Sequence, residues 1–185
     1  MTRKLLILDL DETLIFASER PLDRPADFAT GQYSVYLRPG VQEFLAFCRE
    51  HFDVAVWTSS TESYASGIVR NVFGDGYPLK FVWARSRCSR VFNVELQEHG
   101  PLKDLAKVRR QGYDLEQVLV VDDSPEKLAR SYGNLVQIRP YLGDLEDREL
   151  QLLMPYLLEL KPAPNVRAIE KRGWRSRISA GADRS

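Results

Sequence analysis

The chain has 185 residues, of which 44% are hydrophobic, and this is typical of one globular domain with a sizeable core. Lysine and arginine together number 26, as do aspartate and glutamate, so the formal net charge at pH 7 is zero. A balanced charge gives no long-range field that attracts nucleic acid or a membrane surface, and no apolar run is long enough to span a bilayer. We therefore expect a cytoplasmic protein, monomeric rather than oligomeric, that recognises its partners locally.

The first predicted element is a buried strand that ends in two acids. The apolar run 5–8 is followed by Asp9, Leu10 and Asp11, too early an interruption for a signal peptide. Residues i and i+2 of a strand share a face, so the two carboxylates repel each other unless a cation or a proton lies between them. The alternative is that Asp9 and Asp11 only end the strand and stabilise the following turn.

The next elements alternate between helix and strand. Residues 15–37 carry prolines, a glycine and a short alternating run, which predicts a flap or hairpin beside the end of the first strand. A helical stripe covers 41–51, and a second strand covers 52–57. Ser59 and Glu62 form a capping-box pattern at the start of a helix that runs to about Phe73.

The second half continues this alternation. A third strand is predicted at 80–83, and the irregular stretch 84–101 is expected to form a small hairpin or loop insertion that carries Arg85, Arg87 and Arg90. A short basic helical stretch, a fourth strand, a fifth strand and a last helix follow, at residues 103–110, 118–121, 134–138 and 145–160. Pro155 should kink the last helix and remove one of its hydrogen bonds.

This order predicts an α/β protein: a Rossmann-like, three-layer fold with a central parallel sheet of about five strands and no large cap domain. The fourth strand, like the first, ends in two acids, Asp122 and Asp123. Parallel strands bring their carboxyl ends to one edge of the sheet, so four carboxylates can converge there. Oxygen ligands favour a hard divalent ion, and the sequence therefore predicts a Mg²⁺ site.

We expect one domain over residues 1–162, with the two insertions at 15–37 and 84–101, and a basic C-terminal helix with a frayed tail over 163–185. Trp174 is the residue expected to dock that helix. Cys48 and Cys88 lack the spacing of metal ligands, so we interpret both as reduced thiols.

Five motifs in order resemble one family. They are Asp9-Leu10-Asp11-Glu12-Thr13-Leu14, Leu37-Arg38-Pro39-Gly40-Val41, Val56-Trp57-Thr58-Ser59, Leu102-Lys103-Asp104-Leu105 and Val121-Asp122-Asp123-Ser124-Pro125. Together they resemble the FCP/SCP-type phosphatases of the haloacid dehalogenase superfamily, which dephosphorylate serines of the RNA polymerase II C-terminal repeats. The resemblance covers residues 4–160, and agreement across five ordered motifs is far more specific than any one of them.

The resemblance implies a role for each motif residue. Asp9 is the nucleophile that becomes an aspartyl phosphate, and a carboxylate can attack phosphorus without first losing a proton. Asp11 is the general acid and base, so its side chain points away from the metal. Thr58 donates its hydroxyl to a phosphate oxygen, and Lys103 neutralises charge on Asp9 and the phosphate. The alternatives are that Thr58 caps the next helix and that Lys103 is a surface lysine.

The implied metal ligands are the Asp9 carboxylate, the Asp11 backbone carbonyl and Asp123, with Asp122 orienting Lys103. Small phosphatases of the family carry asparagine where this chain has Asp123, so the assignment within the pair stays open; the pair could also cap the helix after Pro125. Thr58, Ser59 and Arg85 are the predicted substrate-binding residues.

The sequence therefore favours a phosphomonoester hydrolase acting on a phosphorylated substrate such as a protein carrying phosphoserine or phosphothreonine. Two alternatives are a polynucleotide 3′-phosphatase and a non-catalytic, phosphoprotein-binding scaffold on the same fold. Neutral net charge and the absence of an aromatic stacking motif disfavour nucleic acid as the partner, and the presence of both Asp9 and Asp11 disfavours the scaffold.

Overall fold

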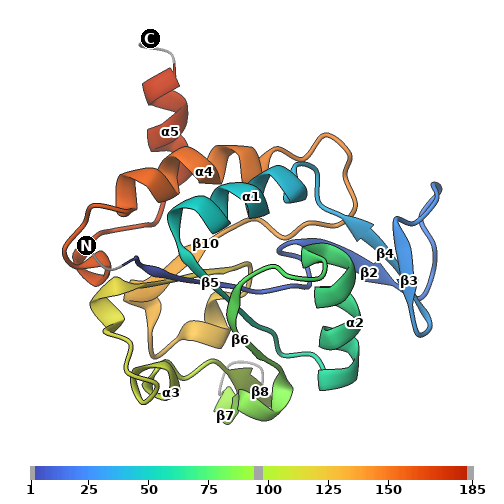
Figure 1. Ribbon diagram of the computed structural model, residues 1–185, viewed down its shortest axis with the longest axis horizontal. Coiled ribbons are helices and arrows are strands. Elements are labelled where there is room, and N and C mark those ends of the chain that lie inside the picture. The colour runs from blue at the N-terminus through green and yellow to red at the C-terminus, as the bar shows by residue number, and fades with distance from the viewer. Residues whose placement is uncertain (1–2, 94–97, 183–185) are drawn as a thin grey trace.

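The computed structural model describes residues 3–93 and 98–182. Its main sheet has five strands in the order β10-β9-β1-β5-β6, and every pairing is parallel (Figure 1). The strands are Leu5–Leu8 (β1), Asp53–Trp57 (β5), Leu79–Trp83 (β6), Val118–Asp122 (β9) and Leu135–Gln137 (β10). The predicted α/β fold with a five-stranded parallel sheet is confirmed. Residues 94–97 of the predicted small insertion and 183–185 of the predicted tail lie outside the described residues.

Both faces of the sheet are buried, which is why its strands are continuous apolar runs rather than alternating ones. Leu6 and Leu8 point into one hydrophobic cluster, and Leu5 and Ile7 point into a second cluster on the opposite face. The sheet is therefore the middle layer of three.

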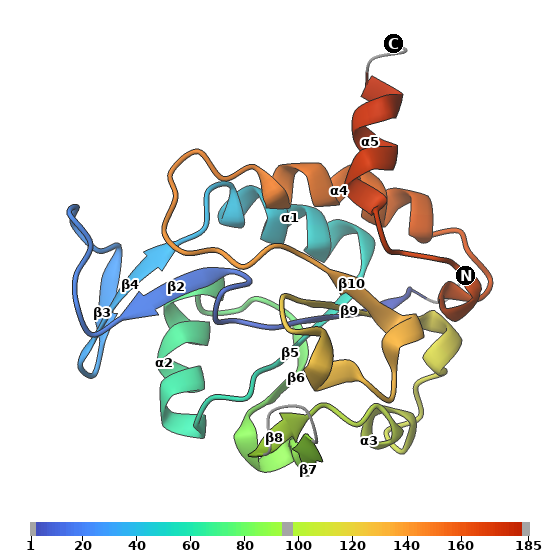
Figure 2. The same ribbon diagram turned by 180° about the vertical axis from the view of Figure 1, so that it is seen from behind.

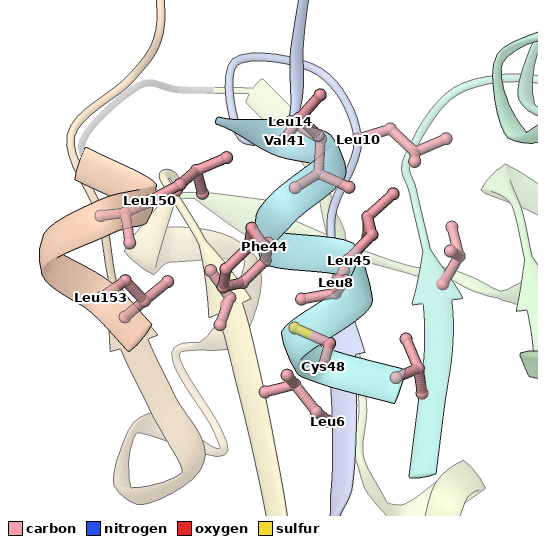
Figure 3. Close-up of a cluster of buried hydrophobic side chains, with 14 of the residues drawn as sticks. Leu6, Leu8, Leu10, Leu14, Val41, Phe44, Leu45, Cys48, Leu150 and Leu153 are labelled. Atoms are coloured by element: carbon pink, nitrogen blue, oxygen red, sulfur yellow. The ribbon is translucent and has the colours of Figure 1, made fainter. Parts of the chain in front are cut away.

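Helices α1 (Val41–His51) and α4 (Glu149–Leu160) run across the first face (Figure 1). Figure 3 shows Phe44 of α1 and Leu150 of α4 packed around Leu6 and Leu8 of β1. Helix α2 (Glu62–Phe73) adds further apolar side chains to the same cluster. Pro155 lies inside α4, which nevertheless continues to Leu160.

The second face is covered by short helices. They include α3 (Ala106–Arg109) and the 3-10 helices Leu115–Gln117 and Pro125–Leu128. The prediction of a helix over 103–110 was wrong at its start, because Lys103 follows a strand and its side chain is buried beside the sheet edge instead of lying on a helix surface.

Both predicted insertions are present as small antiparallel sheets. The first contains β2 (Ile15–Ser18), β3 (Phe28–Thr30) and β4 (Tyr33–Leu37) in the order β2-β4-β3 and projects beyond one end of the main sheet (Figure 2). The second is a hairpin of β7 (Ser89–Asn93) and β8 (Glu98–Leu102), preceded by a 3-10 turn at Arg85–Arg87.

A buried arginine fixes the turn after β1. Both Arg38 Nε and Nη2 donate to the Asp147 carboxylate over 2.8 Å, and Nη1 donates to the carbonyl of Thr13 over 3.0 Å. Arg38 is 1% exposed, so this ion pair has little competition from water.

The segment before α5 (Trp174–Ala182) is packed against the body. Trp174 stacks on Tyr156 and donates from Nε1 to the carbonyl of Gln137 over 2.8 Å, as predicted. Lys171 is also buried and donates to the carbonyls of Gly133, Val166 and Ile169. Val166, Lys171 and Trp174 are thus buried in this segment, whereas Arg167, Glu170 and Arg172 between them are exposed. Within the described ranges, no helix combines the length and the hydrophobicity needed to cross a bilayer.

Candidate active site

Three strand ends meet at one edge of the main sheet. Leu8 of β1 is in register with Val56 of β5 and Val121 of β9, so the residues that follow these positions converge. The backbone N–H of Asp9 donates to the carbonyl of Val121 over 3.0 Å. This register brings Asp9, Thr58 and Asp122 to the same edge, as the sequence predicted for the two acid pairs.

Three carboxylates form a tight cluster at this edge. Asp9, Asp122 and Asp123 each offer one oxygen, and these oxygens lie within 4.8 Å of one another. Asp9 and Asp122 are 1% and 0% exposed. Asp123 Oδ1 is buried and has no hydrogen-bond partner in the part of the chain that the structure describes. A buried oxygen without a partner beside two other carboxylates fits the donor set of a hard divalent cation such as Mg²⁺.

The serine after the acid pair shapes this end of β9. The Ser124 N–H donates to Asp122 Oδ1 over 3.0 Å, and the Ser124 hydroxyl donates to Asp123 Oδ2 over 3.1 Å. Asp122 thus also stabilises the turn into the 3-10 helix Pro125–Leu128. The alternative that the acid pair caps this helix was wrong, because the N-cap is Ser124 and its side chain makes no capping hydrogen bond.

Two lysines offset part of the negative charge of the cluster. Lys103 Nζ lies 2.9 Å from Asp9 Oδ1 and 2.5 Å from Asp122 Oδ2. Lys127 Nζ lies on the same two carboxylates, 3.4 Å from Asp9 Oδ2 and 3.9 Å from Asp122 Oδ1. The sequence analysis missed Lys127, which lies in an ordinary Ser-Pro-Glu-Lys sequence; its position four residues after Asp123 was the only local signal.

The pKa values of these groups follow from burial and from their neighbours. Burial alone would raise the pKa of Asp9, but Lys103 and Lys127 outweigh it and the pKa is lowered. For Asp122, burial and repulsion from Asp9 outweigh the lysines and raise the pKa to about 6. Burial disfavours both ammonium groups, yet the surrounding carboxylates raise the pKa of Lys103 and of Lys127, so both stay charged.

Asp11 is directed away from the three-acid cluster. Its Oδ1 accepts from the Tyr64 hydroxyl over 2.5 Å, and its Oδ2 accepts from the Ser60 hydroxyl over 2.8 Å. Burial raises the pKa of Asp11 above its ordinary value, although these two hydrogen bonds act in the opposite direction. Two aspartates one residue apart therefore have different surroundings, one between lysines and one between hydroxyl groups.

Glu12 is a further acid that the sequence analysis did not single out. Its backbone is left-handed, with φ 55, a conformation that non-glycine residues adopt rarely, and its carbonyl accepts from the Tyr141 N–H over 2.7 Å. Burial, followed by repulsion from Asp11 and Asp123, raises the pKa of Glu12 to about 7.

A cleft of about 250 Å³ opens beside Asp11. Its lining comes from the turn after β1, the flap, the start of α2 and the segment after β6: Asp11, Glu12, Ala17, Tyr33, Ser60, Thr61, Tyr64 and Arg85. Of the three clustered arginines, Arg85 is the one that lines this cleft. Arg87 lies over the ring of Trp83, and Arg90 is on the exposed hairpin.

Ser59 does not cap α2, so that prediction was wrong. The N-cap of α2 is Thr61, and Glu62 Oε1 accepts from the Ser86 N–H over 3.3 Å instead of closing a capping box. The Ser59 carbonyl accepts from Arg85 Nε over 2.8 Å, and the Thr58 hydroxyl oxygen accepts from the Ser60 N–H over 3.1 Å. These contacts hold the loop against the end of β5, and the N-cap of α2 lies two residues after the predicted one.

Comparison with protein-family models matches residues 4–167 to the family of NLI interacting factor-like phosphatases. The chain belongs to this family. The resemblance inferred from the five ordered motifs is therefore confirmed.

Several curated proteins are similar over most of this chain. CTD small phosphatase-like protein 2 of Dictyostelium discoideum is 33% identical over 169 residues, which cover 88% of this chain and 28% of that protein. CTD nuclear envelope phosphatase 1B of Danio rerio is 30% identical over 185 residues, 92% of this chain and 72% of that protein. The chain spans 28–53% of the length of three of these relatives.

Solved structures support the fold assignment. The fission yeast RNA polymerase II CTD phosphatase Fcp1, bound to beryllium fluoride, aligns with a TM-score of 0.58 at 20% identity, covering 98% of this chain and 56% of that one. A haloacid dehalogenase-superfamily hydrolase from Geobacter sulfurreducens aligns with a TM-score of 0.52 at 16% identity, covering 84% of this chain and 100% of that one. The NLI interacting factor-like chain thus has the fold of haloacid dehalogenase hydrolases.

Proposed function

We propose that this protein is a magnesium-dependent phosphomonoester hydrolase that acts through an aspartyl phosphate. The observation that carries the proposal is the unequal environment of Asp9 and Asp11. Asp9 lies between two ammonium groups, which keep its carboxylate ionised and ready to attack. Asp11 has a raised pKa and lies in an open cleft, as a proton donor should.

In the first step, an oxygen of Asp9 forms a bond to phosphorus and the ester P–O bond breaks. The proton held by Asp11 goes to the leaving oxygen. Lys103, 2.9 Å from Asp9, and Thr58, which follows the neighbouring strand β5, would stabilise charge on the phosphoryl oxygens. In the second step, Asp11 removes a proton from a water molecule whose oxygen attacks phosphorus. The bond between the Asp9 oxygen and phosphorus breaks, inorganic phosphate leaves and the Asp9 carboxylate is regenerated.

Magnesium would be held by the Asp9 carboxylate, the Asp11 backbone carbonyl and Asp123, with Asp122 orienting Lys103. The buried, unpartnered Oδ1 of Asp123 supports its choice as the direct ligand. When bound, the ion would neutralise charge on the phosphate and so lower its repulsion of the attacking carboxylate.

The proposed substrate is a phosphate on a macromolecule, with phosphoserine or phosphothreonine in a protein as the leading class. The cleft beside Asp11 opens to solvent between the small flap, the start of α2 and the segment after β6, which leaves room for a large leaving group. Arg85 and Ser59 would contact this substrate. The names of the curated relatives support a phosphoprotein, whereas a polynucleotide 3′-phosphate remains the alternative that a substrate panel must exclude. Cytoplasmic localisation and a monomeric state stay predictions.

Asp9→Asn tests the nucleophile. The variant should lose turnover of an aryl phosphate and keep its far-UV circular dichroism spectrum, because the amide is isosteric but a poor nucleophile. Asp53→Asn is the matched control, since Asp53 begins β5 at the opposite end of the sheet, and it should keep full activity. Full activity in Asp9→Asn would refute the proposal.

Asp11→Asn tests the covalent intermediate. An aryl phosphate has a good leaving group and needs little proton donation, so Asp9 should still be phosphorylated. Hydrolysis should then stall, and intact-protein mass spectrometry after acid quenching should find one phosphoryl group on the chain.

Chelator should abolish turnover reversibly. A panel of phosphopeptides, 3′-phosphorylated oligonucleotides and small phosphometabolites then separates the substrate classes, and phosphopeptide binding without any turnover would favour the scaffold.

A further inference from the structure

Lys127 is a second lysine at the acid cluster, and its position is fixed by the backbone. It lies on the 3-10 helix Pro125–Leu128, and its carbonyl accepts from the N–H of Lys103 over 2.7 Å. This hydrogen bond holds the two lysines side by side. Their side chains differ in freedom, because that of Lys103 is 0% exposed and that of Lys127 is 14% exposed.

The two lysines divide the oxygens of the central acids between them. Lys103 takes Asp9 Oδ1 and Asp122 Oδ2, and Lys127 takes Asp9 Oδ2 and Asp122 Oδ1. The ammonium group of Lys103 lies 2.9 Å from Asp9 Oδ1, so it repels a divalent cation more strongly at that oxygen than at the other one. The remaining oxygen, Asp9 Oδ2, is the one that Lys127 contacts.

We propose that the ammonium group of Lys127 occupies part of the metal site in the metal-free protein. There it contacts Asp9 and Asp122, and it must be displaced when a divalent cation binds. The inference rests on the magnesium site of the proposed function. Lys103 cannot be the group that moves, since its side chain is buried and its ammonium group lies closer to both acids, 2.9 Å from Asp9 Oδ1 and 2.5 Å from Asp122 Oδ2. Lys127 can move, since its ammonium contacts are longer and its side chain reaches solvent.

This arrangement has a definite effect on metal affinity. Without a counter-cation, Asp9, Asp122 and Asp123 would repel one another strongly in a buried site. Lys127 removes part of that repulsion in the metal-free protein, so an arriving ion gains less. The ion must also break two ion pairs and then tolerate a nearby positive charge. Both effects weaken metal binding, and removal of the ammonium group should strengthen it.

Calorimetric titration of chelator-treated protein with Mg²⁺ alone tests the inference. Lys127→Met keeps the length of the side chain without its charge and should bind Mg²⁺ at least about tenfold more tightly than the wild type. Lys127→Arg keeps the charge and should stay within about threefold of the wild type on the same scale. Lys161→Met removes the same charge at the exposed end of α4 and should leave the dissociation constant unchanged.

Each other outcome counts against the inference. Unchanged or weaker binding by Lys127→Met would overturn it, because Lys127 would then not compete with the ion. Tighter binding that Lys161→Met reproduces would assign the effect to net charge and overturn it too. Failure of the wild type and the variants alike to bind Mg²⁺ would refute the metal site of the proposed function, and this result is distinct from an unchanged affinity.

Two measurements keep the test decisive if Lys127→Met folds poorly. In chelator, its melting temperature should be lower than that of the wild type, and Mg²⁺ should raise it by more than in the wild type; an equal rise would contradict the inference. Crystal structures of the wild-type protein with and without Mg²⁺ need no variant. The loaded structure should show Lys127 Nζ moved off Asp9 Oδ2, and an unmoved Nζ beside a bound ion would overturn the proposal.

Discussion

Replacing Tyr64 with phenylalanine tests how the proposed general acid is tuned. Tyr64→Phe removes the hydroxyl that donates to Asp11 Oδ1 over 2.5 Å and leaves the Ser60 hydroxyl on Oδ2. The hydrogen bond from Tyr64 stabilises the ionised form of Asp11, so its loss should raise the pKa of Asp11 further.

The size of this shift follows from what each protonation state loses. A hydrogen bond to a charged group contributes about 1.5–3 kcal/mol and one to a neutral group about 0.5–1.5 kcal/mol. The difference of about 1–1.5 kcal/mol corresponds to a rise of about one unit in the pKa of Asp11. Because the proposed first step needs protonated Asp11, the basic limb of the pH profile should move upward by this amount.

The assay is the pH dependence of kcat/KM on a phosphoserine peptide, whose alkoxide leaving group needs the proton. An aryl phosphate needs it much less and should show little change in the basic limb. Tyr33→Phe is the matched control: Tyr33 packs edge-on against Tyr64 in the same cleft, and its hydroxyl makes no hydrogen bond to Asp11. A basic limb of Tyr64→Phe that stays in place or moves to lower pH would refute the reasoning.

Three further predictions concern stability. Arg38→Met leaves the Asp147 carboxylate without its ion-pair partner and should lower the free energy of unfolding, measured by urea titration, by about 3–5 kcal/mol. Gly67→Ala adds a Cβ that would lie 2.6 Å from Thr30 Oγ1, so this substitution should destabilise the protein although alanine favours a helix. In a Thr30→Ala background the clash is absent, and Gly67→Ala should instead stabilise the protein by up to about 1 kcal/mol. Glu12 has a pKa of about 7 in the folded protein, so the folded chain holds this proton more tightly than the unfolded chain. The metal-free protein should therefore lose stability as the pH rises from 5 to 8, and Glu12→Gln should flatten that slope.

Specific results would contradict these stability predictions. A loss below about 1 kcal/mol for Arg38→Met would mean that its ion pair behaves as a surface pair. Equal effects of Gly67→Ala in both backgrounds would exclude the contact between α2 and the flap. A stability that rises between pH 5 and pH 8 would reverse the sign expected for carboxyl groups with raised pKa values, which include Asp122.

The sequence predicted the site best where charged residues directly follow apolar, buried strands. An apolar run predicts a strand buried on both faces, and acids at its end have no packing reason to be there, so Asp9, Asp11, Asp122 and Asp123 stood out. The parallel sheet then placed two of these strands side by side. Local patterns, together with the rule that parallel strands bring their carboxyl ends to one edge, were enough to predict the fold and the clustering of acids at that edge of the sheet.

Lys127 and Tyr64 were missed because their neighbours are distant in sequence. Lys127 contacts Asp9 from 118 positions away, and Tyr64 reaches Asp11 from 53 positions away. Each residue taken alone resembles an ordinary helix residue, and only the tertiary arrangement brings it to the acids. The capping box at Ser59 failed for the same reason, since Ser86 competes for Glu62.

The packing of Lys171 and Trp174 determines how far the folded domain extends toward the C-terminus. The family match ends at residue 167, but two buried residues, Lys171 and Trp174, lie four and seven residues later. A protein truncated at the family boundary would uncover Tyr156 and leave the carbonyls of Gly133 and Val166 without their ammonium donor. Limited proteolysis should therefore spare the chain at least as far as Trp174, and a boundary chosen by homology alone would be too short.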